Sequence, residues 1–100
     1  MSIADVKIDE KIKSIVREPK KYKVIFLNDE STPVEWVVRL LTEIFKHTQE
    51  SAEKITMTVH HEGSGVVGVY SHEVAEQKTY EAINASRNHG FPLQIRMEEE

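Results

Sequence analysis

The sequence contains no cysteine, which excludes disulfide bonds and metal sites built on thiolates. Glycine and proline are also scarce, with four and three residues. Hydrophobic residues make up 39% of the chain and charged residues 30%, a composition typical of a globular domain. A chain of 100 residues can bury one modest core, so we expect one domain and one functional site.

Long apolar runs are absent as well. No stretch approaches the length of a bilayer-spanning helix, and the N-terminal residues lack the apolar core of a signal peptide. We therefore expect a cytoplasmic protein that does not bind membranes. The formal net charge of −4 argues against generic nucleic-acid binding. Residues 1–21 hold six Lys or Arg against four Asp or Glu, so the negative charge lies in the remaining residues and favours a cationic ligand.

The chain divides into three parts by composition. Residues 1–21 are polar and charged, and their few aliphatic side chains cannot offset the entropy of ordering the segment. We expect a flexible N-terminal arm there, a core domain over residues 22–97 and a short acidic tail in solvent over residues 98–100.

The most informative stretch runs from Tyr22 to Glu35. Apolar residues occupy both faces of a period-two segment over residues 22–27, which predicts a central strand. The following Asn-Asp-Glu-Ser run favours a turn. Thr32-Pro33-Val34-Glu35 has the pattern of a capping box with proline in the first turn, which predicts a helix that begins at Thr32 and continues for about four turns. Trp36 lies off the apolar stripe of this helix, so we expect it partly exposed, either against the arm or in a partner contact.

Local signals also place the remaining elements. A second helix is expected from Thr48 to Gly63 and a short β-rich segment over residues 65–70. Ser71 is expected to cap a third helix, and apolar residues alternate along a last strand near residue 95. The order β-α-α-β-α-β predicts an α+β fold, a small α/β sandwich in which three helices pack on a three-stranded antiparallel sheet.

Catalysis and metal binding find little support in the residues. The serines near the turn have no evident base, so we expect no enzymatic activity. The five histidines lack metal-ligand spacing, so we expect no metal and no cofactor. Thr56 and His60 are four residues apart and share one helix face, which can line a surface. Taken alone, the Asn28-Asp29-Glu30 turn is typical of an ordinary loop that starts a helix.

The run NDESTPVEWV resembles the signature turn of the ClpS adaptor family, which commonly reads NDD-x-TPMEFV. His60, the segments GVVGVY and EVAEQK, and the later Phe91-Pro92-Leu93 follow in family order, so the resemblance covers residues 21–97. It implies the same fold and an adaptor that recognises bulky hydrophobic N-terminal residues (N-degrons) of substrate proteins. Such an adaptor delivers its substrates to a Clp AAA+ unfoldase-protease. The implied partner is the N-domain of an unfoldase of the ClpA or ClpC type, and the arm is implied to engage the unfoldase.

The resemblance also implies a binding site. Asn28, Glu30 and His60 would surround the α-amino group of the substrate's first residue, with Asp29 assisting through water or by ordering the turn. An N-terminal ammonium has three donors and a positive charge, so an amide oxygen, a carboxylate and a neutral imidazole suit it as acceptors. The implied hydrophobic pocket for the first side chain comprises Phe26, Leu27, Thr32, Val34, Val37, Thr56, Val59 and Leu93.

Three positions depart from the family pattern. Glu30 replaces the usual aspartate, and Val34 and Thr56 stand where methionine is common, which affects the expected specificity. Glu73 and Lys78 match positions implied to contact the unfoldase, although on a helix they equally suit a solvated pair.

A rival interpretation is a structural interaction module of similar fold, such as the C-terminal domain of the bacterial ribosomal stalk protein. That module would need neither Asn28 nor His60. The ClpS-like domain of a eukaryotic ubiquitin ligase is disfavoured, because the chain lacks ligase and zinc-binding segments.

Overall fold

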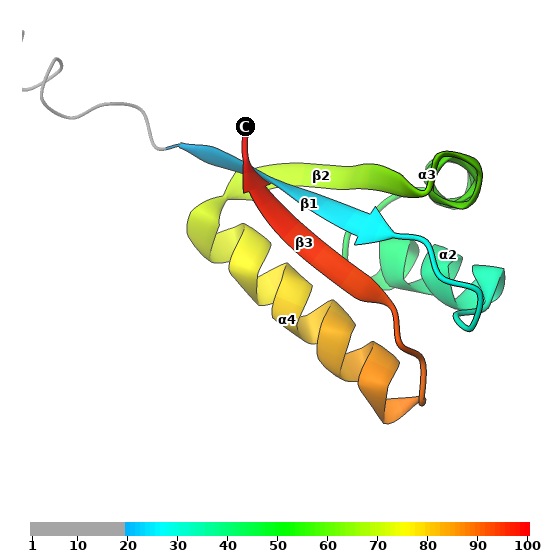
Figure 1. Cartoon of the computed structure of the whole chain (residues 1–100). Helices are drawn as coiled ribbons and strands as arrows, with labels where there is room; N and C mark the ends of the chain where they lie inside the picture. Colours follow the sequence, from blue (N-terminus) through cyan, green and yellow to red (C-terminus); the bar gives the residue numbers. More distant parts are fainter. Residues whose placement is uncertain (1–19) are drawn as a thin grey trace, which may run out of the picture.

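A computed structural model describes residues 20–100, and the expected arm lies outside them except for its last two residues. The elements are β1 (Lys21–Leu27), α2 (Val34–Glu43), α3 (Gln49–Glu62), β2 (Ser64–Ser71), α4 (His72–Asn88) and β3 (Gln94–Glu99) (Figure 1). The predicted order β-α-α-β-α-β is therefore confirmed. β1 lies between β2 and β3 and is antiparallel to both, so the prediction of a central strand is also confirmed. No helix within the described residues is long and apolar enough to cross a membrane.

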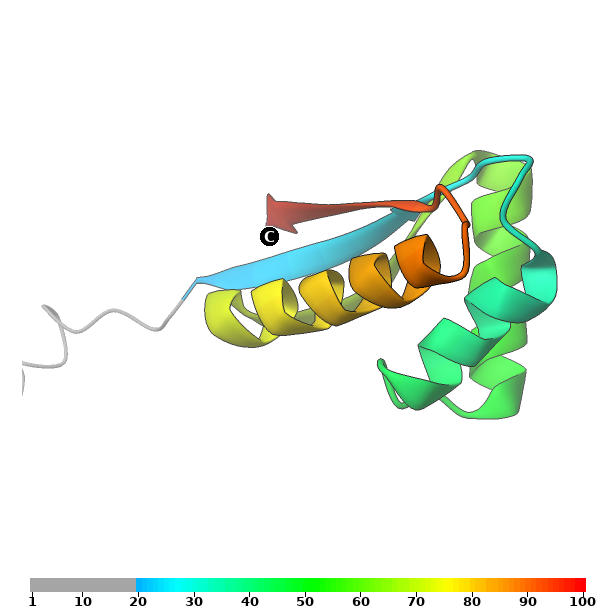
Figure 2. The same cartoon turned by 90° about the horizontal axis from the view of Figure 1, so that it is seen from below.

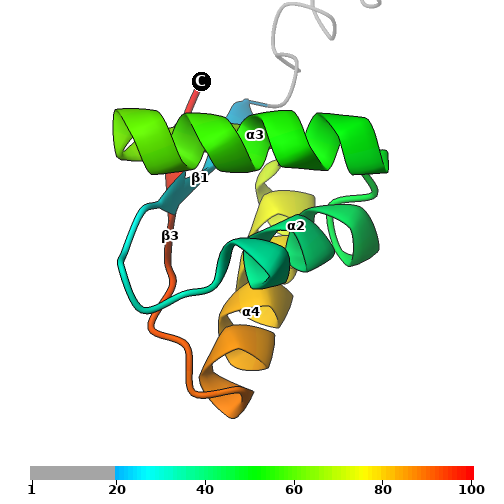
Figure 3. The ribbon, with the colours of Figure 1, turned by 90° about the vertical axis from the view of Figure 1, so that its right-hand side faces the viewer.

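The helices occupy two different places around the sheet. α4 runs along one face of the sheet, while α2 and α3 pack together beyond one of its ends (Figures 2 and 3). Val24 and Phe26 of β1 are completely buried beneath α4, which contributes the fully buried Ala75 and Ala82. These small side chains allow the helix to approach the sheet closely, as their helical spacing predicts.

The start of α2 differs from the prediction. The helix begins at Val34 rather than Thr32, Pro33 is its N-cap, and no side chain caps it. The Thr32 hydroxyl instead donates a hydrogen bond of 2.7 Å to the Asp29 carboxylate. In a capping box the Thr32 hydroxyl would accept a hydrogen bond from a backbone N–H of the helix. The bond that it donates to a carboxylate is charge-assisted and stronger, and it holds Thr32 in the turn. With 10 residues, α2 is also shorter than the predicted four turns.

Trp36 is buried, so the prediction of a partly exposed side chain is wrong. Its indole Nε1 donates a hydrogen bond of 2.9 Å to the hydroxyl of Ser86 in α4. Its ring lies 4.3 Å from the ring of His89 and 5.4 Å from that of Phe91, measured between centroids. The end of α4 and the loop after it thus cover a side of α2 that helical periodicity assigns to solvent.

The other helix ends follow the sequence signals. Thr48 caps α3 by accepting a hydrogen bond from the Ser51 backbone N–H, and Gly63 ends it in the left-handed conformation with φ of 89°. Ser71 caps α4 in the same way as Thr48 caps α3. At the C-terminus, β3 continues to Glu99, and the backbone N–H of Glu100 donates a hydrogen bond of 2.8 Å to the carbonyl of Lys21 in β1. The acidic end expected as a tail over residues 98–100 is therefore exposed but bonded to β1.

Candidate functional site

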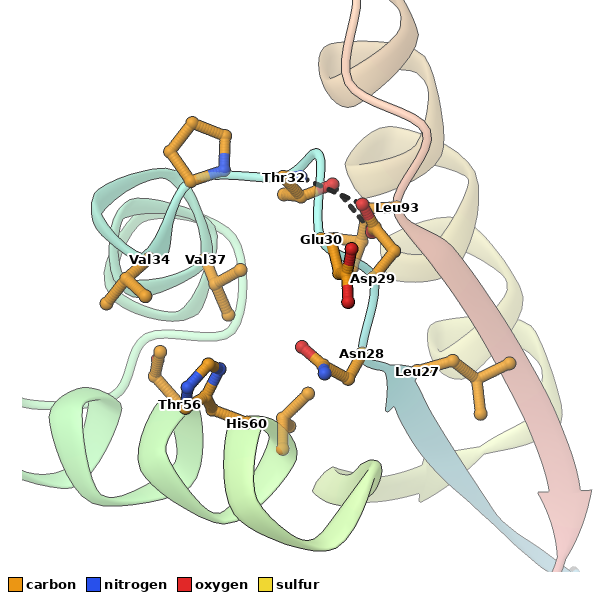
Figure 4. Close-up of a pocket in the computed structure, with 12 residues that line it drawn as sticks. Leu27, Asn28, Asp29, Glu30, Thr32, Val34, Val37, Thr56, His60 and Leu93 are labelled. Atoms are coloured by element: carbon orange, nitrogen blue, oxygen red, sulfur yellow. Dashed lines mark hydrogen bonds between the residues drawn. The ribbon is translucent and has the colours of Figure 1, made fainter.

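A cavity of about 410 Å³ lies where the chain leaves β1, between α2 and α3 (Figure 4). Eleven of the twelve residues expected around the α-amino group and the pocket line it. The complete lining is Leu27, Asn28, Asp29, Glu30, Thr32, Pro33, Val34, Val37, Thr56, Val59, His60 and Leu93. The structure therefore brings together side chains from the first turn, two helices and the segment before β3.

Phe26 is the exception, because it does not line the cavity. It is fully buried in the core and packs edge-on against Phe45, with 5.4 Å between ring centroids. Its place on the core face of β1 turns it toward α4. Leu27 does line the cavity, but its side chain points away from it in Figure 4, so its backbone forms that part of the wall. Pro33 lines the cavity too and is missed by the sequence analysis, although its position between Thr32 and Val34 is a usable signal.

Asp29 orders the turn. One carboxylate oxygen accepts hydrogen bonds of 2.8 Å from the backbone N–H groups of Ser31 and Thr32, and the other accepts the Thr32 hydroxyl. Of the two roles open to Asp29, this geometry matches the ordering of the turn. The backbone N–H of Asn28 also donates a hydrogen bond of 2.9 Å to the carbonyl of Gly63, which joins the turn to the end of α3.

Three acceptor groups remain free at the rim of the cavity. Within residues 20–100, the side chains of Asn28, Glu30 and His60 form no hydrogen bond and no ion pair, and all three residues are exposed. Asn28 and Glu30 extend from the turn and His60 faces them from the last turn of α3 (Figure 4). An amide oxygen, a carboxylate and a neutral imidazole nitrogen all accept hydrogen bonds. The rim is therefore suited to a small cationic group with several donors. No group of three or more residues among those described is arranged to hold a metal ion.

The walls below the rim are apolar. α2 contributes Val37, and α3 contributes Val59 and Thr56, all three buried. The Thr56 hydroxyl donates a hydrogen bond of 2.7 Å to the carbonyl of Ala52 one turn earlier, so its polar group is satisfied within its own helix. Leu93, just before β3, is also buried in the wall. The cavity can thus accept an apolar side chain beneath a charged amine.

A second hollow of about 620 Å³ adjoins the cavity in the groove between α2 and α3. Val34 and Thr56 line both hollows and therefore separate them. Val34 keeps 44% of its surface exposed. The partition between the hollows is made of two short side chains.

Lys78 and Glu73 do not form a pair. The Lys78 ammonium donates a hydrogen bond of 2.7 Å to the carbonyl of Ile44 at the end of α2, and it lies 5.9 Å and 5.5 Å from the ring centroids of Phe45 and Tyr70. Burial raises the pKa of the Tyr70 phenol. Lys78 thus fixes α2 to α4. Glu73 is exposed and has no ion pair within the part of the chain that the structure describes, so the interpretation as a solvated pair is wrong.

Comparison with known proteins identifies relatives along nearly the whole chain. The family model described as "ATP-dependent Clp protease adaptor protein ClpS" matches residues 17–96. The ClpS adapter protein of Helicobacter hepaticus is 35% identical over 97 residues, which are 97% of this chain and 98% of that protein. The ClpS adapter protein of Caulobacter vibrioides is 43% identical over 89 residues, covering 89% of this chain and 82% of that protein.

A solved structure with the same fold is that of Agrobacterium tumefaciens ClpS2 bound to L-phenylalaninamide. It superposes with a TM-score of 0.80 at 40% sequence identity, and the match covers 83% of this chain and 100% of the other. The matching turn, the shared fold and the relatives over most of the chain lead to one conclusion: this chain belongs to the ClpS family of ATP-dependent Clp protease adaptor proteins.

Proposed function

We propose that this protein binds the N-terminal residue of substrate proteins in the cavity and delivers them to a Clp AAA+ unfoldase-protease, without catalysing a reaction itself. The observation that carries the proposal is the set of three free acceptors above an apolar cavity. A substrate N-terminus with a bulky apolar first side chain supplies the matching ammonium and apolar group. The phenylalaninamide bound to the Agrobacterium relative has the same two parts.

We infer that the receiver of the substrate is the N-domain of a ClpA- or ClpC-type unfoldase in the cytoplasm. Glu73 is exposed on the first turn of α4 and is available for this contact. Lys78 has two roles in this proposal. Its hydrogen bond to Ile44 holds the end of α2 against α4, and its side chain is also available for direct contact with the unfoldase. The arm over residues 1–21, whose positive charge opposes that of the body, is proposed as the segment that engages the unfoldase.

A titration with a short Phe-initiated peptide tests the proposal. Burying a large apolar side chain contributes roughly 1.5 to 3 kcal/mol, and each charge-assisted hydrogen bond about 1.5 to 3 kcal/mol. Against an association cost of at least ~4 kcal/mol, the expected affinity extends to the micromolar range. A structural module without this recognition would show no saturable binding, and that result would overturn the proposal.

The role proposed for His60 predicts a loss of affinity when its ring is removed. A neutral imidazole offers a ring nitrogen as an acceptor for the ammonium of the substrate, and alanine offers none. His60→Ala should therefore bind the Phe-initiated peptide about tenfold more weakly than the parent protein, as measured by fluorescence anisotropy.

His61 provides the matched control for this experiment. Its ring lies 5.4 Å from that of His60, between centroids, but it does not line the cavity. His61→Ala should therefore keep the affinity of the parent protein. If His60→Ala binds the peptide as tightly as His61→Ala, the acceptor role of the imidazole is excluded.

The thin partition between the two hollows predicts a broad range of first residues. Since Val34 and Thr56 are short, the parent protein should bind Ile- and Trp-initiated peptides in addition to Leu-initiated ones. Val34→Met adds bulk at the partition and should weaken the Ile and Trp peptides about tenfold relative to the Leu peptide. Val38→Met is the control, because Val38 lines only the second hollow. An unchanged ranking of the three peptides in Val34→Met would contradict this role of the partition.

A further inference from the structure

Gly65 lies on β2 directly against Val59, the α3 residue that forms part of the cavity wall. A Cβ atom added at Gly65 would stand only 2.9 Å from Cγ2 of Val59. Gly65 itself does not line the cavity. We propose that Gly65 is a specificity-determining residue. Because Gly65 has no side chain, the Val59 side chain can lie close to β2, and the cavity stays deep enough for the largest aromatic first residues. This inference rests on the function proposed above.

The need for glycine at this position is steric. The glycines with positive φ in the described chain are Gly63 and Gly90, so the backbone of Gly65 can be adopted by alanine. The other neighbours of the added Cβ, Thr58 Cγ2 and the Val59 nitrogen, are both at 3.6 Å, an ordinary contact distance. The conflict is therefore confined to a single methyl group of Val59.

Val59 cannot move aside freely. It is 3% exposed and belongs to the core, and a valine in a helix strongly prefers one side-chain rotamer. Its carbonyl accepts the N–H of Gly63, whose own carbonyl accepts the N–H of Asn28, so the last turn of α3 is held in place. A methyl group added on β2 should therefore displace the Val59 side chain toward the cavity. The rim acceptors belong to this same fixed frame and should keep their places.

The variant Gly65→Ala tests the inference through selectivity. Binding of Trp-, Phe- and Leu-initiated peptides is measured by fluorescence anisotropy on the full chain. The Trp peptide should lose about tenfold in affinity, which is typical of overpacking by one methyl group, and the Leu peptide less than about threefold. The ratio of the Trp to the Leu affinity is the decisive readout, because a general loss of stability leaves it unchanged.

Gly68→Ala is the matched control on the same strand. There the added Cβ would meet the Tyr70 ring, away from the cavity. This variant should lower thermal stability without changing the Trp-to-Leu ratio. A second pair of variants uses Val59→Ala as its background, which enlarges the cavity but removes the methyl group that Gly65→Ala would meet. In that background, adding Gly65→Ala should leave the Trp-to-Leu ratio of Val59→Ala unchanged.

An unchanged Trp-to-Leu ratio in Gly65→Ala overturns the inference while leaving the proposed function intact. A parent protein that binds none of the three peptides contradicts the proposed function instead, so the two failures are distinguishable. If Gly65→Ala alone does not fold, the double variant Gly65→Ala with Val59→Ala decides: folding with the Trp-to-Leu ratio of Val59→Ala supports the inference, and any other result overturns it.

Discussion

Acetylation of the α-amino group of a Phe-initiated peptide should weaken its binding to this protein by about a hundredfold. The modification removes the positive charge and two of the three donors. The acceptors of Asn28, Glu30 and His60 then lose charge-assisted hydrogen bonds, each of which contributes about 1.5 to 3 kcal/mol. A fluorescence anisotropy titration with the free and the acetylated peptide measures the difference.

Asn28→Ala extends this experiment to a thermodynamic cycle. If Asn28 accepts a bond from the ammonium, its removal should weaken the free peptide and have little further effect on the acetylated one. The turn should persist in this variant, because the bond from residue 28 to Gly63 uses the backbone N–H. Equal affinities for the two peptides with the parent protein would refute the proposed recognition of the α-amino group.

Replacement of Trp36 by alanine should lower the free energy of unfolding by about 3 to 5 kcal/mol. The substitution empties a large buried volume and leaves the buried Ser86 hydroxyl without its indole donor. Trp36→Phe retains most of the ring and loses mainly the hydrogen bond, so its cost should be clearly smaller. Urea denaturation followed by circular dichroism measures both, since Trp36 is the sole tryptophan and fluorescence disappears with it.

Tyr80 offers a control of comparable size. It is an aromatic residue on α4 with 68% of its surface exposed. Tyr80→Ala should change the free energy of unfolding by no more than about 0.5 kcal/mol. A Trp36→Ala variant as stable as Tyr80→Ala would show that the contacts between α2 and α4 contribute little.

The fold could be predicted largely from local patterns. Two-residue periodicity predicts β1, and both of its neighbours then follow from the element order. The helix ends at Thr48, Gly63 and Ser71 depend on bonds within a few residues, which sequence alone contains. These features need no knowledge of tertiary packing.

The sequence-based predictions fail where a distant residue or a competing hydrogen-bond partner determines the local structure. Trp36 is buried by residues some 50 positions away, which helical periodicity does not include. The Thr32 hydroxyl has two possible hydrogen-bond partners, and it bonds to the Asp29 carboxylate rather than to the N-terminus of α2. The candidate site shows the same limit: the residues alone suggest an ordinary turn at Asn28, and its position opposite His60 was expected only through the resemblance to a family. The distance in sequence between Asn28 and His60 makes their juxtaposition a tertiary property.

The bond between the backbone N–H of Asn28 and the carbonyl of Gly63 has a consequence for how binding preferences can change. It ties together the two chain segments that carry the rim acceptors without using any side chain. Substitutions among the apolar wall residues can therefore alter the shape of the cavity while the spacing of the acceptors stays fixed. Detection of a free N-terminus and choice of the residue that bears it are separable tasks in this molecule, and the second can diverge while the first is retained.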